Sequence, residues 1–514
     1  MSDTQGSGSA ERVTQAVEAS PLLDDIIAKT AEDEAQRDGV KGAVATVVDS
    51  WLSEIQAAAE SGGKVRDKGV ADKVRLAIRR IDEQLSSQLA AVMHDEGLQR
   101  LEGTWRGLGH ICFNSETGEN LKIKALHCSK GELHRDLTKA TDVDQSQMFK
   151  KIHEEEFGIA GGMPFGALVG DYYFNADTED MEILQGIAGV AAASFCPFLT
   201  APDPKLFKLD SFGDLSKPAE LASTFEAPSY AKWRSFRESE DSRFVVMTMP
   251  RVLARTPYGT NGRKIEEFDF EEGDVTHKTD GTSEVKQLGH NEYTWMNAAY
   301  VFGTQMTNAF AETGWCTSAR GFANGGKVGN LPVHTFTDDE GDEAMKCPTE
   351  IAITDRRDGE LSRLGFLPLC HYKNTDYAVF FGGETVRKPK KYEGPGAKDA
   401  EANDKLSCGI QHVMAISRIS HYLKVAARDR IGSMMEADEC ETWLNEWIAG
   451  YVLADEKATP EMKARYPLAE ARIDVEPGDL PGEYNAVAYL RPWLPLEQLT
   501  TSMRLVATIP ERKA

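Results

Sequence analysis

Apolar positions near the start of the chain recur at the spacing of a short helix. Ser20 is a suitable N-cap, and Pro21 suits the first helical position. Asp24 and Asp25 follow in the first turn, where the helix dipole favours negative charge. A helix this short is marginal in water, so we expect it either to dock on its own chain or to bind a partner's groove. Its apolar stripe consists of Leu22, Leu23, Ile26 and Ile27.

The residues on either side of this helix follow different patterns. Residues 1–19 are rich in small polar residues and have no apolar period, which predicts a disordered tail. Residues 20–38 then hold the short, exposed amphipathic helix and a linker. Two longer helical patterns fill residues 39–96 and predict an antiparallel helical pair. Their apolar positions are Val44, Val48, Trp51, Leu52 and Ile55, followed by Val70, Val74, Ile78, Ile81, Leu85 and Leu89.

The pattern changes near residue 97, where apolar runs typical of strands alternate with helical stretches. We therefore expect a mixed α/β body over residues 97–395, built of one or two subdomains. A strongly amphipathic helix is predicted after it, from about residue 407 to residue 431. The strand-like runs are residues 121–126, 167–174, 244–249 and 377–381, and helical stretches surround Ile183 and Trp295. The apolar face of the late helix comprises Val413, Ile416, Ile419, Leu423 and Ala427.

Strand character returns at the end of the predicted segment 396–514. Terminal strands present unpaired edges unless something covers them. We expect them either to complete a sheet within the chain or to pair with a neighbouring subunit by β-augmentation. The alternating positions are Tyr484, Ala486, Ala488 and Leu490 in one run, and Met503, Leu505, Ala507 and Ile509 in the next.

Composition and charge narrow the kinds of partner. The 514 residues exceed one ordinary domain, and 41% hydrophobic with 27% charged residues is typical of a globular protein. A formal net charge of −24 disfavours nucleic acid, whose binding depends on clustered Lys and Arg, and also disfavours anionic membranes. The eight cysteines form no CxxC pair, and the N-terminus lacks the features of a secretory signal. These features predict a cytoplasmic protein with reduced thiols.

Residues 183–202 carry no charge over about the length that a membrane helix needs. Gly186, Gly189 and several alanines give little hydrophobicity toward lipid, and Pro197 interrupts the stretch. We expect instead a buried helix that ends near Ser194, followed by a short strand, and no direct insertion into a membrane.

Residues 321–327, GFANGGK, have the GxxxxGK spacing of a loop that binds phosphates. Val328 follows where Ser or Thr would ligate magnesium, and the next residues cannot begin the helix that faces the phosphates. A glycine-rich turn between elements is therefore the favoured interpretation.

Other residues with suitable chemistry lack a supporting motif. His127, Cys128 and His134 are metal-ligand types without the spacing of a zinc site. Cys316 and His334 are conceivable as nucleophile and base, but no hydrolase signature surrounds either of them. We predict no catalytic residue, no metal site and no cofactor.

The charged runs of the sequence give little evidence for a binding site. The acidic residues at 154–156 and 338–343 do not fit a calcium-binding loop, so solvated surface is the ordinary explanation. The alternating charges at 355–358 suit surface ion pairs or a subunit contact as well as they suit a phosphate.

Several long segments together point to one family. They are LEGTWRGL at 101, FGIAGGMPFGALVGDYYF at 157, VLARTPYG at 252, WMNAAYVFG at 295, GWCTSARGFANGGKVGNLPVHTF at 314, EIAITDRRDGELSRLGFLPL at 350, YAVFFGGETVRKPKKY at 377, HVMAISRISHYLKVAARDRIG at 412 and LRPWLPLEQLTTSMRLV near the end. From about residue 95 to its end, the chain resembles the TssC or VipB large sheath proteins of type VI secretion systems.

The resemblance implies a structural protein and not an enzyme. It implies a mixed α/β fold whose core is shared with contractile phage tail sheaths, extended by N-terminal helices and C-terminal strands. Such proteins assemble in the bacterial cytoplasm with a small sheath subunit of the TssB or VipA type and with copies of themselves. The helical lattice surrounds an inner tube of Hcp, joins a baseplate, and contracts to drive the tube out of the cell.

The resemblance also implies roles for two sets of partner-binding residues. The stripe of Leu22, Leu23, Ile26 and Ile27 would be taken by the ClpV AAA+ ATPase, which recycles subunits. The strands that contain Tyr484 and Met503 would pair with neighbouring protomers. Two alternatives remain open: a cytoplasmic enzyme, either a Cys/His hydrolase or a nucleotide-binding protein, and a phage-type contractile sheath outside secretion.

Overall fold

The computed structural model divides the chain into two compact units and describes most of residues 70–493. One unit contains Met1–Ala91, Tyr258–Thr260 and Lys264–Glu272, and the other contains the rest of the chain. Four predicted elements lie outside the described residues: the tail, the predicted short helix at Leu22, the first helix of the predicted pair and the predicted strand at Met503. Gaps in the description are residues 218–219, 260–261, 266–269, 274, 278–282, 286–287, 338–339, 395, 434, 456 and 479–483.

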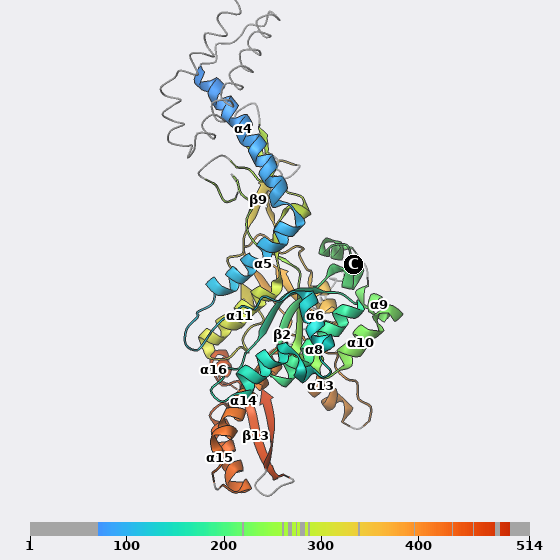
Figure 1. Ribbon diagram of the computed structural model, residues 1–514, viewed down its shortest axis with the longest axis vertical. Coiled ribbons are helices and arrows are strands. Elements are labelled where there is room, and N and C mark those ends of the chain that lie inside the picture. The colour runs from blue at the N-terminus through green and yellow to red at the C-terminus, as the bar shows by residue number, and fades with distance from the viewer. Residues whose placement is uncertain are drawn as a thin grey trace, which may run out of the picture. The chain divides into compact units, whose positions relative to one another are not determined.

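Helices and strands alternate through the described residues (Figure 1). The helices are α4 (Val70–Met93), α5 (Glu96–Phe113), α6 (Lys130–Lys139), α7 (Gln147–Phe149), the π-helix η2 (Lys150–Gly158), α8 (Thr178–Ala193), α9 (Leu221–Glu226), α10 (Ala231–Glu238), α11 (Ala298–Thr313), α12 (Asp355–Arg363), α13 (Ala397–Ser407), α14 (Ile410–Arg430), α15 (Ala437–Ala449) and α16 (Pro460–Arg465). The strands are β1 (Leu168–Phe174), β2 (Phe198–Pro202), β3 (Val245–Met249), β4 (Val252–Leu253), β5 (Val275–His277), β6 (Ser283–Val285), β7 (Trp295–Met296), β8 (Lys327–Val328), β9 (His334–Thr337), β10 (Glu343–Lys346), β11 (Leu367–His371), β12 (Ala378–Phe380), β13 (Leu468–Pro477) and β14 (Tyr484–Pro492).

A six-stranded sheet in the order β1-β2-β3-β11-β12-β8 forms the centre of the larger unit. The first four strands run parallel, and β12 and β8 add antiparallel pairs at one side. Every residue of β2 and of β3 is buried. Near-continuous apolar strands of this kind are expected where helices cover both faces of a parallel sheet.

The two faces of this sheet belong to two separate hydrophobic clusters. Phe198, Val245 and Met247 point to the cluster that includes α8 and α10, whereas Leu199 and Val246 point to the cluster that includes α11. This split follows from the alternation of side chains along a strand. Figure 1 shows α8 and α11 on either side of β2. The mixed α/β fold class expected from the sequence is confirmed.

Several predicted elements agree with the structure. The uncharged stretch forms α8, which ends at Ala193, and then β2, which begins at Phe198. The late amphipathic helix is α14, although Ala427 on its predicted apolar face is exposed. Among the residues that the structure describes, no helix is both long and apolar enough to cross a membrane.

One predicted strand is wrong. Residues 121–126 alternate like a strand but form none, and Leu126 in this run is exposed. Apolar and polar residues do alternate in this run. However, a strand needs a neighbouring strand to pair with, and local alternation cannot show whether one is available.

Helix α5 approaches the body closely because glycines line its inner face. A Cβ on Gly103 would collide with the carbonyl oxygen of Trp295, and one on Gly107 would collide with the ring of Tyr300. Both glycines are buried. Their lack of a side chain therefore allows α5 to lie against β7 and α11.

We expect Gly107→Ala to lower the free energy of unfolding by about 1–3 kcal/mol, because overpacking of this size usually has that cost. Gly109→Ala on the same helix is the matched control, since its Cβ would meet the Phe113 ring at an ordinary 3.6 Å. The control should gain helix propensity worth about 0.5–1 kcal/mol. Urea denaturation of both variants makes the comparison, and equal effects would contradict the close docking of α5.

Candidate assembly surfaces

The end of the described chain forms an antiparallel hairpin of β13 and β14. Its register runs from Leu468 opposite Pro492 to Pro477 opposite Tyr484, with one irregularity between Leu468 and Glu470. The alternation in β14 was predicted from the sequence, but β13 was not. The signal was present, because Ala471, Ile473 and Val475 alternate with charged residues, as in a half-buried strand.

One face of the hairpin packs on α15. Ile473 of β13 is buried in the same cluster as Leu444 and Ile448 of α15, and Ala488 and Leu490 of β14 pack against that cluster. The other face includes exposed Tyr489. Of the four predicted apolar positions of β14, Ala488 and Leu490 thus face α15, whereas Tyr484 and Ala486 are exposed.

Side chains of α15 also cover the outer edge of β13. The Nδ2 of Asn445 donates to the carbonyl oxygen of Ile473 at 2.6 Å, and Asn445 Oδ1 accepts from the backbone N–H of Ile473 at 3.0 Å. Glu441 Oε2 accepts from the backbone N–H of Val475 at 2.9 Å. These backbone groups point away from β14, so a second strand cannot pair with β13 there without displacing α15.

The outer edge of β14 is placed differently. Ile473 lies opposite Ala488, and Val475 lies opposite Ala486. Because residues of a non-hydrogen-bonded antiparallel pair both direct their backbone groups outward, Ala486 and Ala488 present theirs to the outer edge of β14. In the described part of the chain, this sheet ends at β14. The hairpin therefore has one edge closed by α15 and one edge suited to accept another strand.

The predicted partner-binding residues divide between the described and undescribed parts of the chain. The hairpin contains Tyr484, Ala486, Ala488 and Leu490. The ATPase-binding candidates Leu22, Leu23, Ile26 and Ile27 and the second strand candidates Met503, Leu505, Ala507 and Ile509 lie outside the described residues, so their roles stay predictions.

Helices α4 and α5 each carry an exposed apolar stripe. On α5 the ring of Trp105 is 65% exposed, and Leu98 and Leu101 lie at helical spacing from it. On α4 the exposed positions are Ile78, Ile81, Leu85, Leu89 and Val92. Contiguous exposed apolar surface commonly marks a site of protein association. Most of the α4 positions were expected to pack within a helical pair, and the exposure of Trp105 was not predicted.

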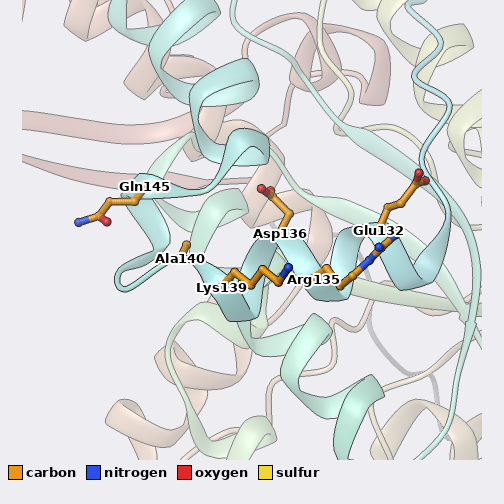
Figure 2. A pocket seen from close by; sticks show the side chains of 6 residues that line it. All are labelled: Glu132, Arg135, Asp136, Lys139, Ala140 and Gln145. Atoms are coloured by element: carbon orange, nitrogen blue, oxygen red, sulfur yellow. The ribbon is translucent and has the colours of Figure 1, made fainter.

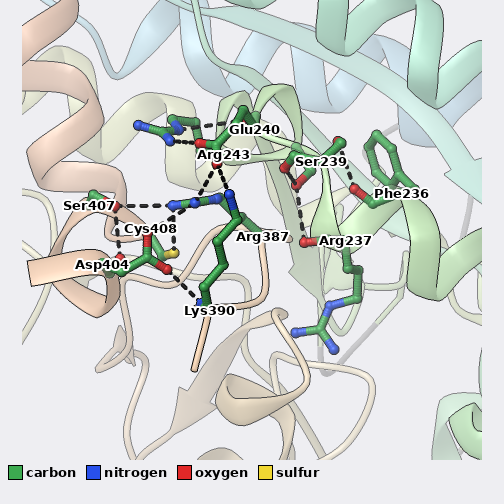
Figure 3. Close-up of polar contacts among 11 residues, drawn as sticks. Phe236, Arg237, Ser239, Glu240, Arg243, Arg387, Lys390, Asp404, Ser407 and Cys408 are labelled. Atoms are coloured by element: carbon green, nitrogen blue, oxygen red, sulfur yellow. Dashed lines mark hydrogen bonds and ion pairs between the residues drawn. The ribbon is translucent and has the colours of Figure 1, made fainter. Parts of the chain in front are cut away.

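A network of ion pairs centres on Arg387 (Figure 3). Its side chain is 2% exposed and contacts Glu240 Oε1 and Asp404 Oδ1, each at 2.9 Å. Lys390 Nζ also binds Glu240, at 2.6 Å. The hydrogen bond from Lys390, with the charges of Arg387 and Arg243, lowers the pKa of Glu240 to about 2. The network ties α13 to the segment that follows α10.

A second buried network surrounds Glu350, whose side chain has no exposed surface. Arg251 binds both carboxylate oxygens, at 2.8 Å and 2.7 Å, and His290 Nε2 lies 3.0 Å from Oε1. Burial alone would raise the pKa of Glu350, but the hydrogen bonds from Arg251 and His290 outweigh burial and lower it to about 2. The carboxylate is therefore held ionised inside the body.

The GFANGGK segment is a turn that enters a strand, not a helix. Gly321 and Gly325 both have positive φ, and Lys327 begins β8. The Lys327 ammonium lies 4.2 Å from the centroid of the Tyr377 ring. A phosphate-binding loop needs backbone N–H groups at a helix N-terminus, which this geometry does not provide.

Cys316 and His334, considered above as nucleophile and base, each contact other residues. Cys316 packs against the cluster around α11, and burial raises its pKa to about 11, which disfavours the thiolate. His334 Nδ1 lies 3.1 Å from the Tyr293 hydroxyl. Among the metal-ligand candidates, His134 Nε2 pairs with Glu182 at 2.9 Å. The described residues contain no group of three or more acidic, His or Cys side chains that could hold a metal ion.

The charges at 355–358 contribute to contacts within the chain. Arg357 binds Glu360 at 2.6 Å and donates to the backbone oxygens of Leu215 and Lys217. Burial raises the pKa of Asp358 to about 6. These two side chains contribute to packing around α12 rather than to an open phosphate site.

A polar hollow of about 470 Å³ lies along α6 (Figure 2). Charged side chains line it, and the Asp136 carboxylate accepts the backbone N–H groups of Gln147 and Met148, both at 2.9 Å. That carboxylate thus anchors the start of α7.

Comparisons with known proteins agree on one family. The family model described as "EvpB/VC_A0108, tail sheath N-terminal domain" matches residues 75–387, and "EvpB/VC_A0108, tail sheath gpW/gp25-like domain" matches residues 399–509. Arg387 is the last residue of the first match and Asp404 lies in the second, so the Arg387 network joins the two matched regions. The "Type VI secretion system sheath protein TssC1" of Pseudomonas aeruginosa is 43% identical over 513 residues, which cover 99% of this chain and 98% of that protein.

Two solved structures show weaker similarity. One is the anti-feeding prophage baseplate, with a TM-score of 0.32 and 10% identity over 64% of this chain and 66% of that chain. The other is the contracted helical sheath of the anti-feeding prophage, with a TM-score of 0.27 and 11% identity over 64% of this chain and 75% of that chain. Scores this low do not establish a shared fold, so the assignment rests on the sequence matches. This chain belongs to the TssC/VipB family of tail sheath proteins and is a contractile sheath subunit of a type VI secretion system.

Proposed function

We propose that this chain builds the sheath wall with a small sheath subunit of the TssB or VipA type and with copies of itself. The assembly is cytoplasmic, surrounds an Hcp inner tube and joins a baseplate. The chain acts through a change of lattice state and not through catalysis, because a metastable extended lattice can release free energy on contraction. The family assignment supports this proposal, and the surroundings of Lys327 and Cys316 offer no competing chemistry.

The outer edge of β14 is the observation that carries the proposal. Asn445 and Glu441 satisfy the outward backbone groups of Ile473 and Val475 on the opposite strand. A neighbouring strand therefore has only one edge of this hairpin to join, the edge that contains Ala486 and Ala488. The predicted strand at Met503–Ile509 of another protomer has the alternation of a suitable donor.

Backbone pairing of this kind suits a lattice that changes shape. Main-chain hydrogen bonds hold two subunits together whatever their side chains are, and a strand tethered by a linker tolerates rotation of the body behind it. The mesh can thus stay connected while the subunits slide from one arrangement to the other.

Negative-stain electron microscopy tests the proposed function. The chain is co-expressed with its small sheath partner and compared with the chain expressed alone. We expect hollow tubes only when both chains are present. A discrete particle that never polymerises in the presence of the partner would overturn the proposal.

The helix predicted at Leu22 has a separate role in the proposal, as the segment that the ClpV ATPase takes. Replacing Leu23 and Ile26 with Asp removes its apolar stripe, so we expect normal tubes whose disassembly by ATP and ClpV is slower. Replacement of Asp24 and Asp25 with Asn is the matched control, because it changes two polar positions of the same segment and leaves the apolar stripe intact. Turbidity of contracted tubes follows disassembly, and an unchanged rate in the Leu23/Ile26 variant would remove this role.

A further inference from the structure

The helix before β1 changes its winding partway along its length. Gln147–Phe149 form the α-helix α7, and Lys150–Gly158 continue it as the π-helix η2. A π-helix, in which hydrogen bonds join residues five apart, is rare and occurs mostly as a single turn, often at a functional site. The nine residues of η2 exceed a single turn. The sequence and the surrounding contacts must therefore favour this winding over the ordinary α-helix.

The spacing of two apolar residues favours the π winding. Ile152 and Phe157 are both buried, with 5% and 7% of their surface exposed, and they lie five residues apart. An α-helix turns about 100° per residue, so it would place these two side chains about 140° apart around its axis. In a π-helix, residues five apart lie almost one above the other. Of the two windings, only the π-helix buries both side chains on one face.

Side chains of α14 hold the end of this π-helix. The Arg428 guanidinium donates to three successive carbonyl oxygens, at 3.4 Å, 3.2 Å and 3.0 Å, which belong to Phe157, Gly158 and Ile159. The Lys424 ammonium lies 3.4 Å from the centroid of the Phe157 ring. The end of a helix leaves carbonyl groups without partners, and Arg428 supplies donors to them here. These contacts require Phe157 to point toward α14.

The same end of η2 also holds the loop that leads to β1. Oε2 of Glu156 accepts from the backbone N–H of Met163 at 3.0 Å, and Lys124 pairs with the other oxygen of this carboxylate. The loop is apolar at its surface, because Ile159 and Met163 are 56% and 49% exposed. A change of winding at this end would therefore move an exposed apolar loop.

The contact between η2 and α14 joins two distant parts of the chain. The π-helix lies in the region that matches the tail sheath N-terminal domain, and α14 lies in the region that matches the gpW/gp25-like domain. Val425 and Ile431, each three residues from Arg428, are 45% and 82% exposed. Exposed apolar residues at this spacing lie on one side of a helix and suit a contact with another protein. A subunit bound there would act on α14 beside Arg428.

We propose that η2 is a conformational switch whose π winding depends on Arg428 and Lys424 of α14. When α14 moves away, the segment rewinds to an α-helix, which places Phe157 about 140° around the axis from Ile152 and takes its ring off α14. The loop before β1 then moves with the end of the helix. The use of this switch in a change of lattice state rests on the function proposed above.

Hydroxyl-radical footprinting of the full chain tests the rewinding. Mass spectrometry measures labelling of the Phe157 ring in the native chain and in Arg428→Met. We expect labelling to rise at least about threefold in the variant, because Phe157 is only 7% exposed before rewinding. Arg430→Met is the matched control, since that guanidinium lies over the Trp443 ring, 4.7 Å from its centroid. Unchanged labelling of Phe157 in Arg428→Met would overturn the proposal.

Deletion of Glu155 separates rewinding from a simple loss of contact. Without this exposed residue, Ile152 and Phe157 are four residues apart, the spacing that an α-helix places on one face. When the deletion is combined with Arg428→Met, we therefore expect labelling of Phe157 to fall to the native level. Glu155→Ala combined with Arg428→Met keeps the chain length and should keep the high labelling. High labelling in both combined variants would show a loss of contact without rewinding and would contradict the switch.

The role in the lattice is tested with the single changes at Glu155. The native chain, Glu155→Ala and the Glu155 deletion are each co-expressed with the small sheath partner, and cryo-electron microscopy counts extended and contracted tubes. We expect the native proportion from Glu155→Ala and a different proportion from the deletion, whose helix is fixed in the α winding. The same proportion in all three chains, or no tubes from the deletion alone, would overturn the lattice role. No tubes from the native chain would instead contradict the function proposed above.

Discussion

Proline in place of Ala486 is expected to abolish tube formation while the chain remains folded. The N–H of Ala486 points to the outer edge of β14, because its partner Val475 directs its own N–H to Glu441. Proline removes that donor and places its ring where a neighbouring strand would lie. Ala486 is exposed, so the substitution disturbs no buried side chain. Negative-stain microscopy counts tubes, and circular dichroism checks the fold.

Two matched variants distinguish the loss of the outer-edge contact from a loss of hairpin stability. Ala486→Ser keeps the N–H and should form tubes normally. Asn485→Pro removes a donor that points toward β13, so it should lower the thermal stability of the hairpin as well as assembly. Normal tubes from Ala486→Pro would show that the outer edge of β14 makes no contact in the lattice.

Arg251→Met is expected to lower the free energy of unfolding by about 3–5 kcal/mol, because it leaves the buried Glu350 carboxylate without its main partner. Arg100→Met is the control, since the Arg100–Glu96 pair is 73% and 87% exposed and such pairs contribute about 0–1 kcal/mol. Denaturant titration measures both variants. Similar small effects would mean that the Glu350 network contributes little.

The same network predicts a pH dependence. The folded-state pKa of Glu350 is about 2, which lies below the ordinary glutamate value of about 4.3. Its stabilising contribution is therefore complete above the ordinary value and is lost as pH falls toward 2. Arg251→Met should flatten the stability curve between about pH 4.3 and about pH 2, the window in which this contribution is lost. If the variant lost stability in acid as the native chain does, the assignment of this pH dependence to Glu350 would be contradicted.

Elements with a strong local signal were predictable from the sequence. The uncharged stretch contains enough small apolar residues to specify a buried helix, and Pro197 marks the start of the strand that follows Ser194. The turn at GFANGGK was also predictable, because one missing hydroxyl at Val328 removed the phosphate interpretation. In each case the decisive information lies within about one turn or strand of the residue concerned.

Features that depend on distant parts of the chain were not predictable. Glu350 and Arg251 are 99 residues apart, and neither residue has a local pattern that marks it as buried. The outer edge of β13 is closed by Asn445, which lies 28 residues before Ile473 on another element. Alternation in β14 showed that a strand would form, but only tertiary packing decides which of its edges another subunit can use.

A cryo-electron microscopy reconstruction of the assembled tube tests the central claim most directly. We expect a strand from a neighbouring subunit that is hydrogen-bonded to Ala486 and Ala488 along the outer edge of β14, with α15 still covering β13. A lattice in which that edge faces solvent or a helix would contradict the claim that this hairpin joins the subunits.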